Sequence, residues 1–279
     1  MTLRLDVMAL GLSFMALDPT VSEWLNLFVR WVHIFAGILW VGQTYLFTWL
    51  DGRLAKEADQ VWMVHSGGFY VVEKQKTPEL LRGKLHWFRW EAAITWLSGV
   101  VLLTLVYYMG GVLVDESVAN ISVGTGVVIG VGALVAGWLV YDAMAQSPLA
   151  NSETLFAVVS FVLVVAAAYG LSRVLSARAA YMHVGAMFGT IMAANVWERI
   201  LPAQRKMVAA LQAGQKPDLT LAARAKLRSK HNTYIVVPLV FLMISSHFPT
   251  ATYGNAYSLG ILAALVLAGW GAAKLIRRA

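Results

Sequence analysis

The sequence predicts an all-α protein, a polytopic transmembrane helix bundle of about seven spans with amphipathic helices at the inner surface. Hydrophobic residues make up 59% of the 279 residues, charged residues only 13%, and the mean hydropathy is +0.65. This composition is typical of a membrane protein. No sustained polar–apolar alternation indicates a strand. Apolar runs able to cross a bilayer as helices lie at 24–50, 88–109, 123–145, 154–175, 179–201, 233–248 and 255–275.

The spacing of these runs predicts a single membrane domain over residues 24–279, because only the connections 51–87 and 202–232 are of any size. Residues 1–23 are expected to form a tail or a helix in the membrane interface. A signal peptide is the alternative, but Asp6 interrupts the apolar stretch and no small-residue cleavage site follows.

Individual segments carry further signals. Trp24 and Trp49 flank the first span, as interfacial anchors do. The next connection contains SGGFY at 66–70, whose glycine pair favours a tight turn. The fourth span contains LFAVVSFVLVVAAAYGL, a stretch without charge that is expected to face lipid.

The fifth span and the segment after it differ in character. Small residues recur every four positions from Gly185 to Ala193, which would let another helix or a flat ligand approach closely. The segment 203–230 is basic and predicts two amphipathic helices on the inner surface, separated at Gly214 and Pro217.

The net charge of +7 is distributed as a topology signal, with the N-terminus outside and the C-terminus in the cytoplasm. The outer side then has only Arg4, Arg30, Arg173 and Arg178. The other lysines and arginines fall on the inner side, so the charge indicates a bacterial inner membrane and anionic lipid head groups rather than nucleic acid. The chain has no cysteine, which excludes disulfides, iron–sulfur clusters, thiolate metal sites and a covalently attached c-type haem.

Histidines at membrane depth are the first candidates for chemistry. With this topology, His33, His183 and His247 lie in the outer half of the bilayer, whereas His65, His86 and His231 lie on the inner side. Imidazole is a good axial ligand for haem iron, so the outer three predict a haem b site. Arg30 is placed for a haem propionate, and Gly37 shares a helical stripe with His33. The alternatives are buried histidines with structural hydrogen bonds, or a zinc site formed by the same three.

Glu91 is the other outlier, about one turn inside the second span and on a stripe with Trp87. A buried carboxylate can exchange protons near neutral pH, which makes Glu91 a candidate general base. The alternative is a carboxylate that reaches the interface or pairs with Arg89. Asn195 and Asn232 should lie near the same level, either as substrate ligands or as helix–helix hydrogen bonds. Aromatic residues there could stack a planar ligand, although an aromatic belt explains them equally well.

Several strings together resemble the membrane domain of the bacterial membrane-bound urate oxidase (urate hydroxylase) family. They are RWVHIFAGILWVG (30–42), VHSGGFYVVEKQ (64–75), HWFRWEAAITWLSG (86–99), AGWLVYD (136–142), HVGAMFGTIMAANV (183–196), QRKMVAAL (204–211) and RSKHNTYIVVPLVFLMISSHFP (228–249). The resemblance runs from about Trp24 to Tyr257. It implies oxidation of urate to 5-hydroxyisourate, with electrons delivered to cytochrome c.

Two features limit what the resemblance implies. Better-known family members continue into a cytochrome c module, whereas this sequence ends at KLIRRA, so a separate cytochrome c or a quinone is the expected electron acceptor. The chain could also be a paralogue that uses another substrate. The H-x6-W-x-G pattern starting at His33 is also similar to other membrane haem proteins, including the oxygen-dependent protoporphyrinogen oxidase type.

The sequence thus predicts a membrane oxidoreductase. Urate is expected to bind on the inner side near His65, His86, Glu91, Asn195 and Asn232, with Glu91 or His86 as the base. Haem held by His33 with His183 or His247 would pass electrons to the acceptor. A non-catalytic haem-bearing membrane anchor and a small-solute or proton transporter are the competing interpretations.

Overall fold

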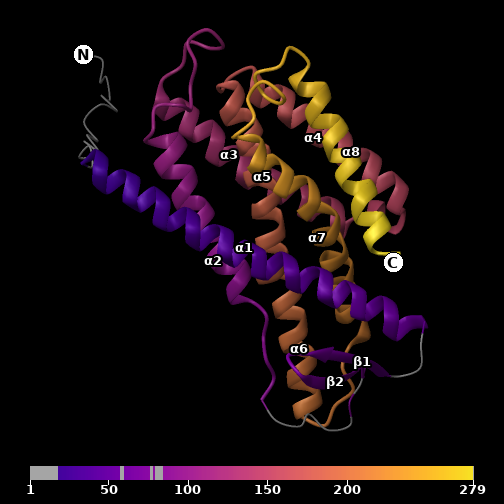
Figure 1. The fold of residues 1–279 in the computed structure, drawn as a ribbon. Helices are drawn as coiled ribbons and strands as arrows, with labels where there is room; N and C mark the ends of the chain where they lie inside the picture. The colour runs from indigo at the N-terminus through magenta and orange to yellow at the C-terminus, as the bar shows by residue number, and fades with distance from the viewer. Residues whose placement is uncertain (1–17, 57–59, 76–77, 79–83, 279) are drawn as a thin grey trace, which may run out of the picture.

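The computed structural model describes residues 18–56, 60–75, 78 and 84–278. The predicted helical bundle is confirmed (Figure 1). Its helices are α1 (Pro19–Lys56), α2 (Trp90–Leu103) with the π-helix η2 (Thr104–Tyr108), α3 (Val123–Gln146), the short 3-10 helix η3 (Pro148–Asn151), α4 (Glu153–Ser172), α5 (Ala177–Ala194) with the π-helix η4 (Asn195–Ile200) and α6 (Leu201–Gln212), α7 (Leu219–Ser245) and α8 (Ser258–Ile276). Each predicted span thus coincides with a helix.

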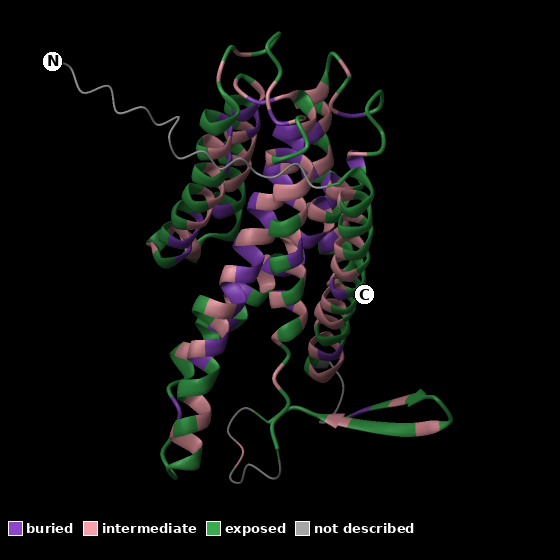
Figure 2. Ribbon diagram, turned by 90° about the vertical axis from the view of Figure 1, so that its left-hand side faces the viewer, coloured by how far each residue is buried: buried purple, intermediate pink, exposed green. Residues whose placement is uncertain are grey.

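Five of these helices are long and apolar enough to cross a membrane: α1, α2 with η2, α3, α4 and α8. The helices of the two remaining predicted spans, α5 and α7, lie in the middle of the bundle, where a helix faces its neighbours rather than lipid. α5 is the most buried helix and packs against α2, α3, α4 and α7. Burial is accordingly concentrated in the centre of the molecule (Figure 2).

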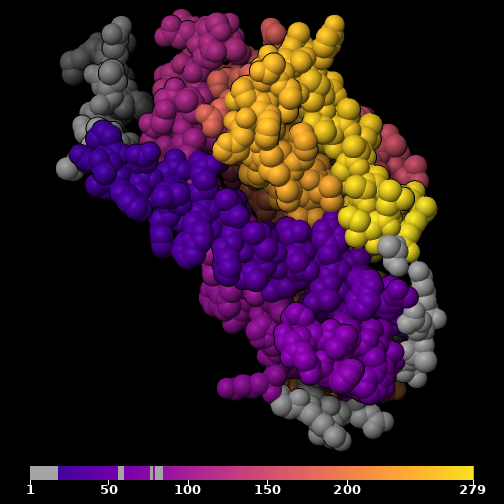
Figure 3. Space-filling view, viewed as in Figure 1, coloured from indigo at the N-terminus to yellow at the C-terminus, as the bar shows by residue number. Residues whose placement is uncertain are grey.

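α1 is the longest helix, with 38 residues and therefore a length of roughly 57 Å at 1.5 Å per residue. The hydrocarbon core of a bilayer is only about 30 Å thick, so α1 must tilt or extend beyond it. It packs mainly on α2 and crosses one side of the bundle diagonally (Figures 1 and 3). Large apolar side chains, including Trp31 and Ile38, are exposed along it, as expected of a lipid-facing surface.

α1 begins five residues earlier than the predicted span. The Asp18 carboxylate accepts a hydrogen bond from the Thr20 N–H at 2.9 Å, and Pro19 occupies the first helical position. Both are established helix-start signals. Residues 1–17 of the predicted tail lie outside the described residues.

A β-hairpin is the feature that the all-α prediction missed. β1 (Gln60–His65) pairs antiparallel with β2 (Gly68–Glu73), and His65 is opposite Gly68. The tight turn expected at SGGFY is confirmed, because Ser66 and Gly67 both have positive φ angles, 49° and 74°. Two such residues form the turn that matches the twist of a two-residue hairpin.

The two amphipathic segments predicted over 203–230 are helical, but they continue the spans instead of lying apart from them. α6 extends the α5–η4 helix, and the second segment is the first part of α7. The break between them is where the sequence predicted it, with Gly214 at φ +68°. Asp218 caps α7, and the hydrogen bonds from Thr220 lower the pKa of this exposed carboxyl group.

Candidate functional site

A buried ion pair joins α3 and α7 at the C-terminal end of α3. Asp142 is only 7% exposed, and its Oδ1 lies 2.8 Å from Nη2 of Arg228, which is 4% exposed. Arg199 donates to the same carboxylate from η4, with Nε 2.8 Å from Oδ1. Two guanidinium groups therefore compensate one buried carboxylate, and removing the carboxylate would leave buried positive charge.

Asn195 extends this ion pair into a hydrogen-bond chain. Its Oδ1 accepts from Arg228 Nη1 at 3.3 Å, which fixes the orientation of the amide. Its Nδ2 donates to the Tyr141 hydroxyl and to Asn232 Oδ1, both at 2.9 Å. Asn232 in turn donates to the Met192 carbonyl at 3.1 Å. Both amide hydrogens of Asn195 are thus engaged, as expected of a buried polar group.

The hydrogen-bond chain that starts at Asp142 ends at His231. The Tyr141 oxygen accepts from Asn195 and lies 2.8 Å from His231 Nδ1, to which we assign the hydroxyl hydrogen. With this assignment Nδ1 is an acceptor, and the neutral ring carries its hydrogen on Nε2. The ring stacks on Phe156, with centroids 4.6 Å apart. We call the connected residues the Asp142 network: Tyr141, Asp142, Asn195, Arg199, Arg228, His231 and Asn232.

His231 lines a cavity of about 870 Å³ bounded by α3, α4, α5, α7 and α8. Its walls are mostly apolar, with contributions from Gly137, Met187 and Phe188. Most of its polar lining residues come from the C-terminal ends of α3 and α8, the N-terminal part of α4 and the middle of α7: Tyr141, Glu153, Thr154, Lys230, His231, Tyr234 and Lys274. Ser160 and Trp270 line the cavity further along α4 and α8. The volume is within the range of small-molecule sites.

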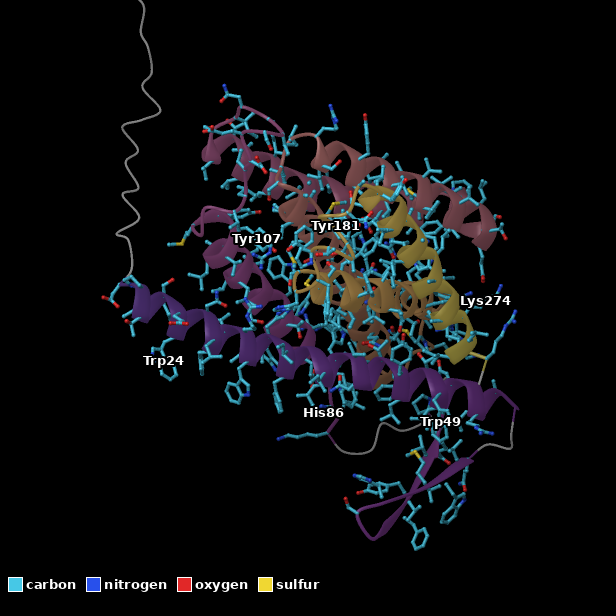
Figure 4. The ribbon with its side chains drawn as sticks, turned by 45° about the horizontal axis from the view of Figure 1, so that its top comes forward. Trp24, Trp49, His86, Tyr107, Tyr181 and Lys274 are labelled. Carbon is cyan, nitrogen blue, oxygen red and sulfur yellow. The ribbon has the colours of Figure 1, made fainter. Side chains whose placement is uncertain are left out.

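A second polar cluster lies toward the N-terminal end of α3. His183 is completely buried, its Nδ1 donates to the Ala179 carbonyl at 2.8 Å, and its Nε2 accepts from the Tyr108 hydroxyl at 3.1 Å. A Cβ atom at Gly130 would lie 2.5 Å from Nε2, so only glycine fits there. We call Tyr107, Tyr108, Arg178 and His183 the His183 cluster. Tyr107 lies inside the bundle in Figure 4, well away from Lys274 of the cavity.

Charge is also present beside the His183 cluster. The Arg178 guanidinium lies 5.7 Å from the centroid of the Tyr107 ring, and the charge of Arg30 also acts on the Tyr107 phenol. Arg178 Nε is buried without a hydrogen-bond partner among the described residues. An acidic ligand group would satisfy it.

His33 packs against α2. Its Nδ1 donates to the Thr95 carbonyl at 2.8 Å, and a Cβ atom at Gly99 would lie 3.0 Å from the ring. Gly37, one turn further along α1, also faces Thr95. His33 thus contacts α2 while His183 contacts η2 and α3, so the structure does not show the two rings on a common face.

Glu91 lies in the first turn of α2, and no hydrogen bond among the described residues connects it to the Asp142 network. It is half-buried, and its Oε1 accepts from Gln43 Nε2 at 3.0 Å. Next to it, Trp40, Trp87 and Trp197 pack around a small buried cluster. The hydrogen bond from Gln43 is the only direct one to the Glu91 carboxylate within the described part of the chain. The second carboxylate oxygen therefore remains available to a ligand.

The remaining predicted residues are exposed. His86 lies in the extended segment before α2, with its ring against Phe88 (Figure 4). His65 ends β1, and His247 follows α7. Of the predicted substrate ligands, the structure brings Asn195 and Asn232 into direct contact and leaves the others apart. Among the described residues no group of three histidine or acidic side chains could hold a metal ion such as zinc.

The family model described as urate oxidase N-terminal matches residues 19–277. The chain belongs to this family. The match covers every helix of the bundle, so the resemblance seen in the motifs is confirmed. Searches of curated proteins and of solved structures gave no match.

Sequence reasoning missed five members of the Asp142 network as site residues: Tyr141, Asp142, Arg199, Arg228 and His231. Tyr141 and Asp142 end the AGWLVYD string, and Arg228 and His231 open the RSKHNTY string. The usable signal was an arginine and an aspartate near the inner ends of different spans, because buried charges in a membrane protein pair with one another.

Proposed function

We propose that this family member is an inner-membrane oxidoreductase. Its proposed substrate is urate, which it oxidises to 5-hydroxyisourate; a similar planar anion is the alternative substrate. The family match over residues 19–277 carries the proposal. Its proposed orientation has the N-terminus outside, the C-terminus in the cytoplasm and the Asp142 network on the cytoplasmic side. The positive-inside distribution of lysine and arginine supports this orientation.

We place urate beside Glu91. Gln43 holds one oxygen of this carboxylate and leaves the other free to take an N–H proton from the purine. The neighbouring Trp87 and Trp197 rings supply faces for stacking a planar ligand. His86 belongs to the same extended segment as Trp87, so it would orient the anion from the membrane surface, and His65 would attract it.

Removal of the proton concentrates negative charge on urate and makes its oxidation easier. Water then supplies the oxygen: urate and water give 5-hydroxyisourate, two electrons and two protons. Glu91 can receive one of these protons and release it to the cytoplasmic surface. Asn195 and Asn232 have their amides engaged in the Asp142 network, so we assign them a positioning role rather than direct contact with urate.

The redox group we propose is haem b, which accepts electrons one at a time when bound. The donor chemistry of two residues fits it. His33 and His183 each use Nδ1 to donate to a backbone carbonyl, which is the usual arrangement of a metal-ligating histidine and leaves Nε2 for the iron. The lack of a side chain at Gly99 and Gly130 lets the two rings pack directly against α2 and α3. Arg30, and Arg178 through the Nε that has no partner among the described residues, would hold acidic groups. His247 is the alternative second ligand, from the surface.

Turnover by the purified protein tests the proposed reaction. The full chain in detergent or nanodiscs should consume urate anaerobically when ferricyanide is supplied, because a chemical oxidant replaces the natural acceptor. That acceptor is a separate cytochrome c or a quinone. Absence of urate consumption with every acceptor would exclude the proposed reaction.

The second candidate function is a haem-bearing membrane anchor that passes electrons for another enzyme. The tautomers of His33 and His183 favour it as much as they favour an oxidase. It predicts a b-type spectrum without urate-dependent reduction, so the same preparation separates the two functions.

A further inference from the structure

We propose that the cavity between α3, α4, α5, α7 and α8 binds a quinone, and that this quinone accepts the electrons. The binding site is argued from the cavity alone. The source of the electrons is the proposed urate oxidation, on which the second half of the proposal rests.

His231 supplies a neutral N–H donor to the cavity lining. With the Tyr141 hydrogen assigned to Nδ1, the histidine carries its own hydrogen on Nε2. Trp270 also lines the cavity, but its indole nitrogen is buried away from the open space. A carbonyl oxygen of a quinone is an acceptor of the kind that His231 requires.

The shape of the cavity suits an apolar tail. Residues along the whole of α4 line the cavity. Small residues among them, such as Ala157, Ala167 and Gly170, have short side chains that project little into it. Val140, Val158 and Leu163 line the cavity and are also exposed on the surface of α3 and α4. The cavity therefore reaches the lipid-facing side of two apolar helices, which gives a membrane-dissolved molecule a lateral route.

The charges among the polar lining residues favour a quinone over a phospholipid. A phosphate head group requires uncompensated positive charge. Lys230 is bound to Glu153, which neutralises it, and the histidine is neutral. Only Lys274, near the C-terminal end of α8, adds a cation to the lining that this structure describes.

The complete reaction balances with a quinone as the oxidant. Urate and water give 5-hydroxyisourate with release of two electrons and two protons. The quinone takes up two electrons and two protons and becomes a hydroquinone. His231 can donate its Nε2 hydrogen to one quinone oxygen while Nδ1 takes the proton of the Tyr141 hydroxyl. Solvent water then returns the proton to Tyr141 and supplies the second proton of the hydroquinone, and the two protons released from urate oxidation balance this uptake. No oxygen and no hydrogen peroxide take part.

Photolabelling tests the site independently of activity. The full chain in nanodiscs is irradiated with azido-ubiquinone, with and without excess decylubiquinone. Competed labels are expected in peptides covering 150–171 and 270–274. Ala157→Trp fills the cavity and should lower competed labelling by about tenfold or more, whereas Leu155→Trp, on the same helix but outside the lining, should not. Equal labelling of both variants would overturn the proposal.

The donor is tested in the same assay. His231→Phe keeps an aromatic ring and removes the N–H group, so it should weaken the competition by decylubiquinone by about tenfold. Trp31→Phe, on the exposed side of α1, is the control. Unchanged competition in His231→Phe, or a tightly held phospholipid that decylubiquinone does not displace, would refute the quinone site.

The two proposals fail in different ways. A protein that consumes urate with ferricyanide but shows no competed label in the cavity contradicts the quinone site and leaves the proposed function standing. A protein that is labelled there but oxidises no urate with any acceptor retains the binding site, and the role of the quinone as the oxidant of urate is refuted. Urate-dependent formation of hydroquinone that Ala157→Trp abolishes, with ferricyanide turnover intact, supports both.

Discussion

Two buried polar regions of the described bundle, the Asp142 network and the His183 cluster, satisfy their polar groups differently. In the network, both arginines bind Asp142, both amide hydrogens of Asn195 are engaged, and His231 lines the cavity. In the cluster, His183 Nε2 accepts only from a tyrosine hydroxyl, and Arg178 Nε has no partner among the described residues. A contact of that kind can be exchanged for a ligand, whereas a paired charge cannot.

Each region lies beside a π-helix. Tyr107 and Tyr108 belong to η2, and Asn195 opens η4. A π-helical turn inserts an extra residue and occurs frequently at functional sites. The comparison favours the cluster as the proposed haem site, and it favours a positioning role for the network apart from His231.

The largest expected effect is the loss of haem from the His183 cluster. His183→Ala should abolish a b-type Soret band, because a helix offers no neighbouring side chain to replace an axial ligand. His231→Ala should keep the band, since its Nε2 carries a hydrogen. Absorption spectra with and without dithionite measure both. The His33→Ala spectrum then shows whether His33 is the second ligand, and a His247→Ala spectrum tests the exposed alternative.

A matched variant shows whether loss of haem in His183→Ala results from misfolding instead of the loss of a ligand. Tyr108→Phe removes the hydroxyl that competes for His183 Nε2 and should leave haem content equal or higher. A Soret band lost in His231→Ala and kept in His183→Ala would reverse the roles assigned to the two regions.

The next effect is on stability. Asp142→Ala leaves Arg228 buried without a counter-charge and should lower the free energy of unfolding by about 3–5 kcal/mol. Lys74→Ala breaks the exposed pair with Asp51 and should change it by about 0–1 kcal/mol. Thermal unfolding in one detergent compares the two variants. Equal melting temperatures would mean that the network is not stabilising.

Catalysis provides the third prediction. Glu91→Gln preserves size and the contact with Gln43 but cannot accept a proton, so urate turnover should fall by about 10²-fold or more with haem content unchanged. Glu198→Gln, an exposed carboxylate on η4, is the control. Lower yield with normal turnover of the surviving protein would show that Glu91 is structural.

The smallest effect concerns the hydrogen-bond chain itself. Tyr141→Phe removes one hydroxyl between Asn195 and His231 and should reduce stability by about 1–3 kcal/mol, because the Asn195 donor is left unpaired. It should also weaken competition by decylubiquinone in the cavity, since the His231 tautomer is no longer fixed. Phe156→Leu keeps the hydrogen bonds from Asn195 through Tyr141 to His231. It should therefore leave the His231 tautomer unchanged, as measured by nitrogen-15 NMR of labelled histidine.

Helix positions followed from the sequence because apolar length decides them, and each predicted span from 24–50 to 255–275 coincides with a helix. The hairpin was missed because its strands are short and mostly exposed, so no alternation marks a buried face. The contact between Asn195 and Asn232 agreed with their expected common depth. The Arg228–Asp142 pair did not follow, because one sequence cannot show which residues 86 positions apart will meet.

The same limit applies to the candidate site. Glu91 was identified by its residue type alone, and its partner Gln43 lies on a different helix 48 residues away. His231 was assigned only to a side of the membrane, because its tautomer depends on Tyr141 from α3 and Asn195 from η4. Burial and hydrogen-bond order are properties of the packed bundle.

The origin of the oxygen atom in the product tests the central claim most directly. The protein is supplied anaerobically with urate and ferricyanide in water enriched in oxygen-18, and the product is analysed by mass spectrometry. We predict labelled 5-hydroxyisourate with two ferricyanide ions reduced for each urate consumed. Turnover that requires molecular oxygen and releases hydrogen peroxide, or no turnover at all, would contradict the account.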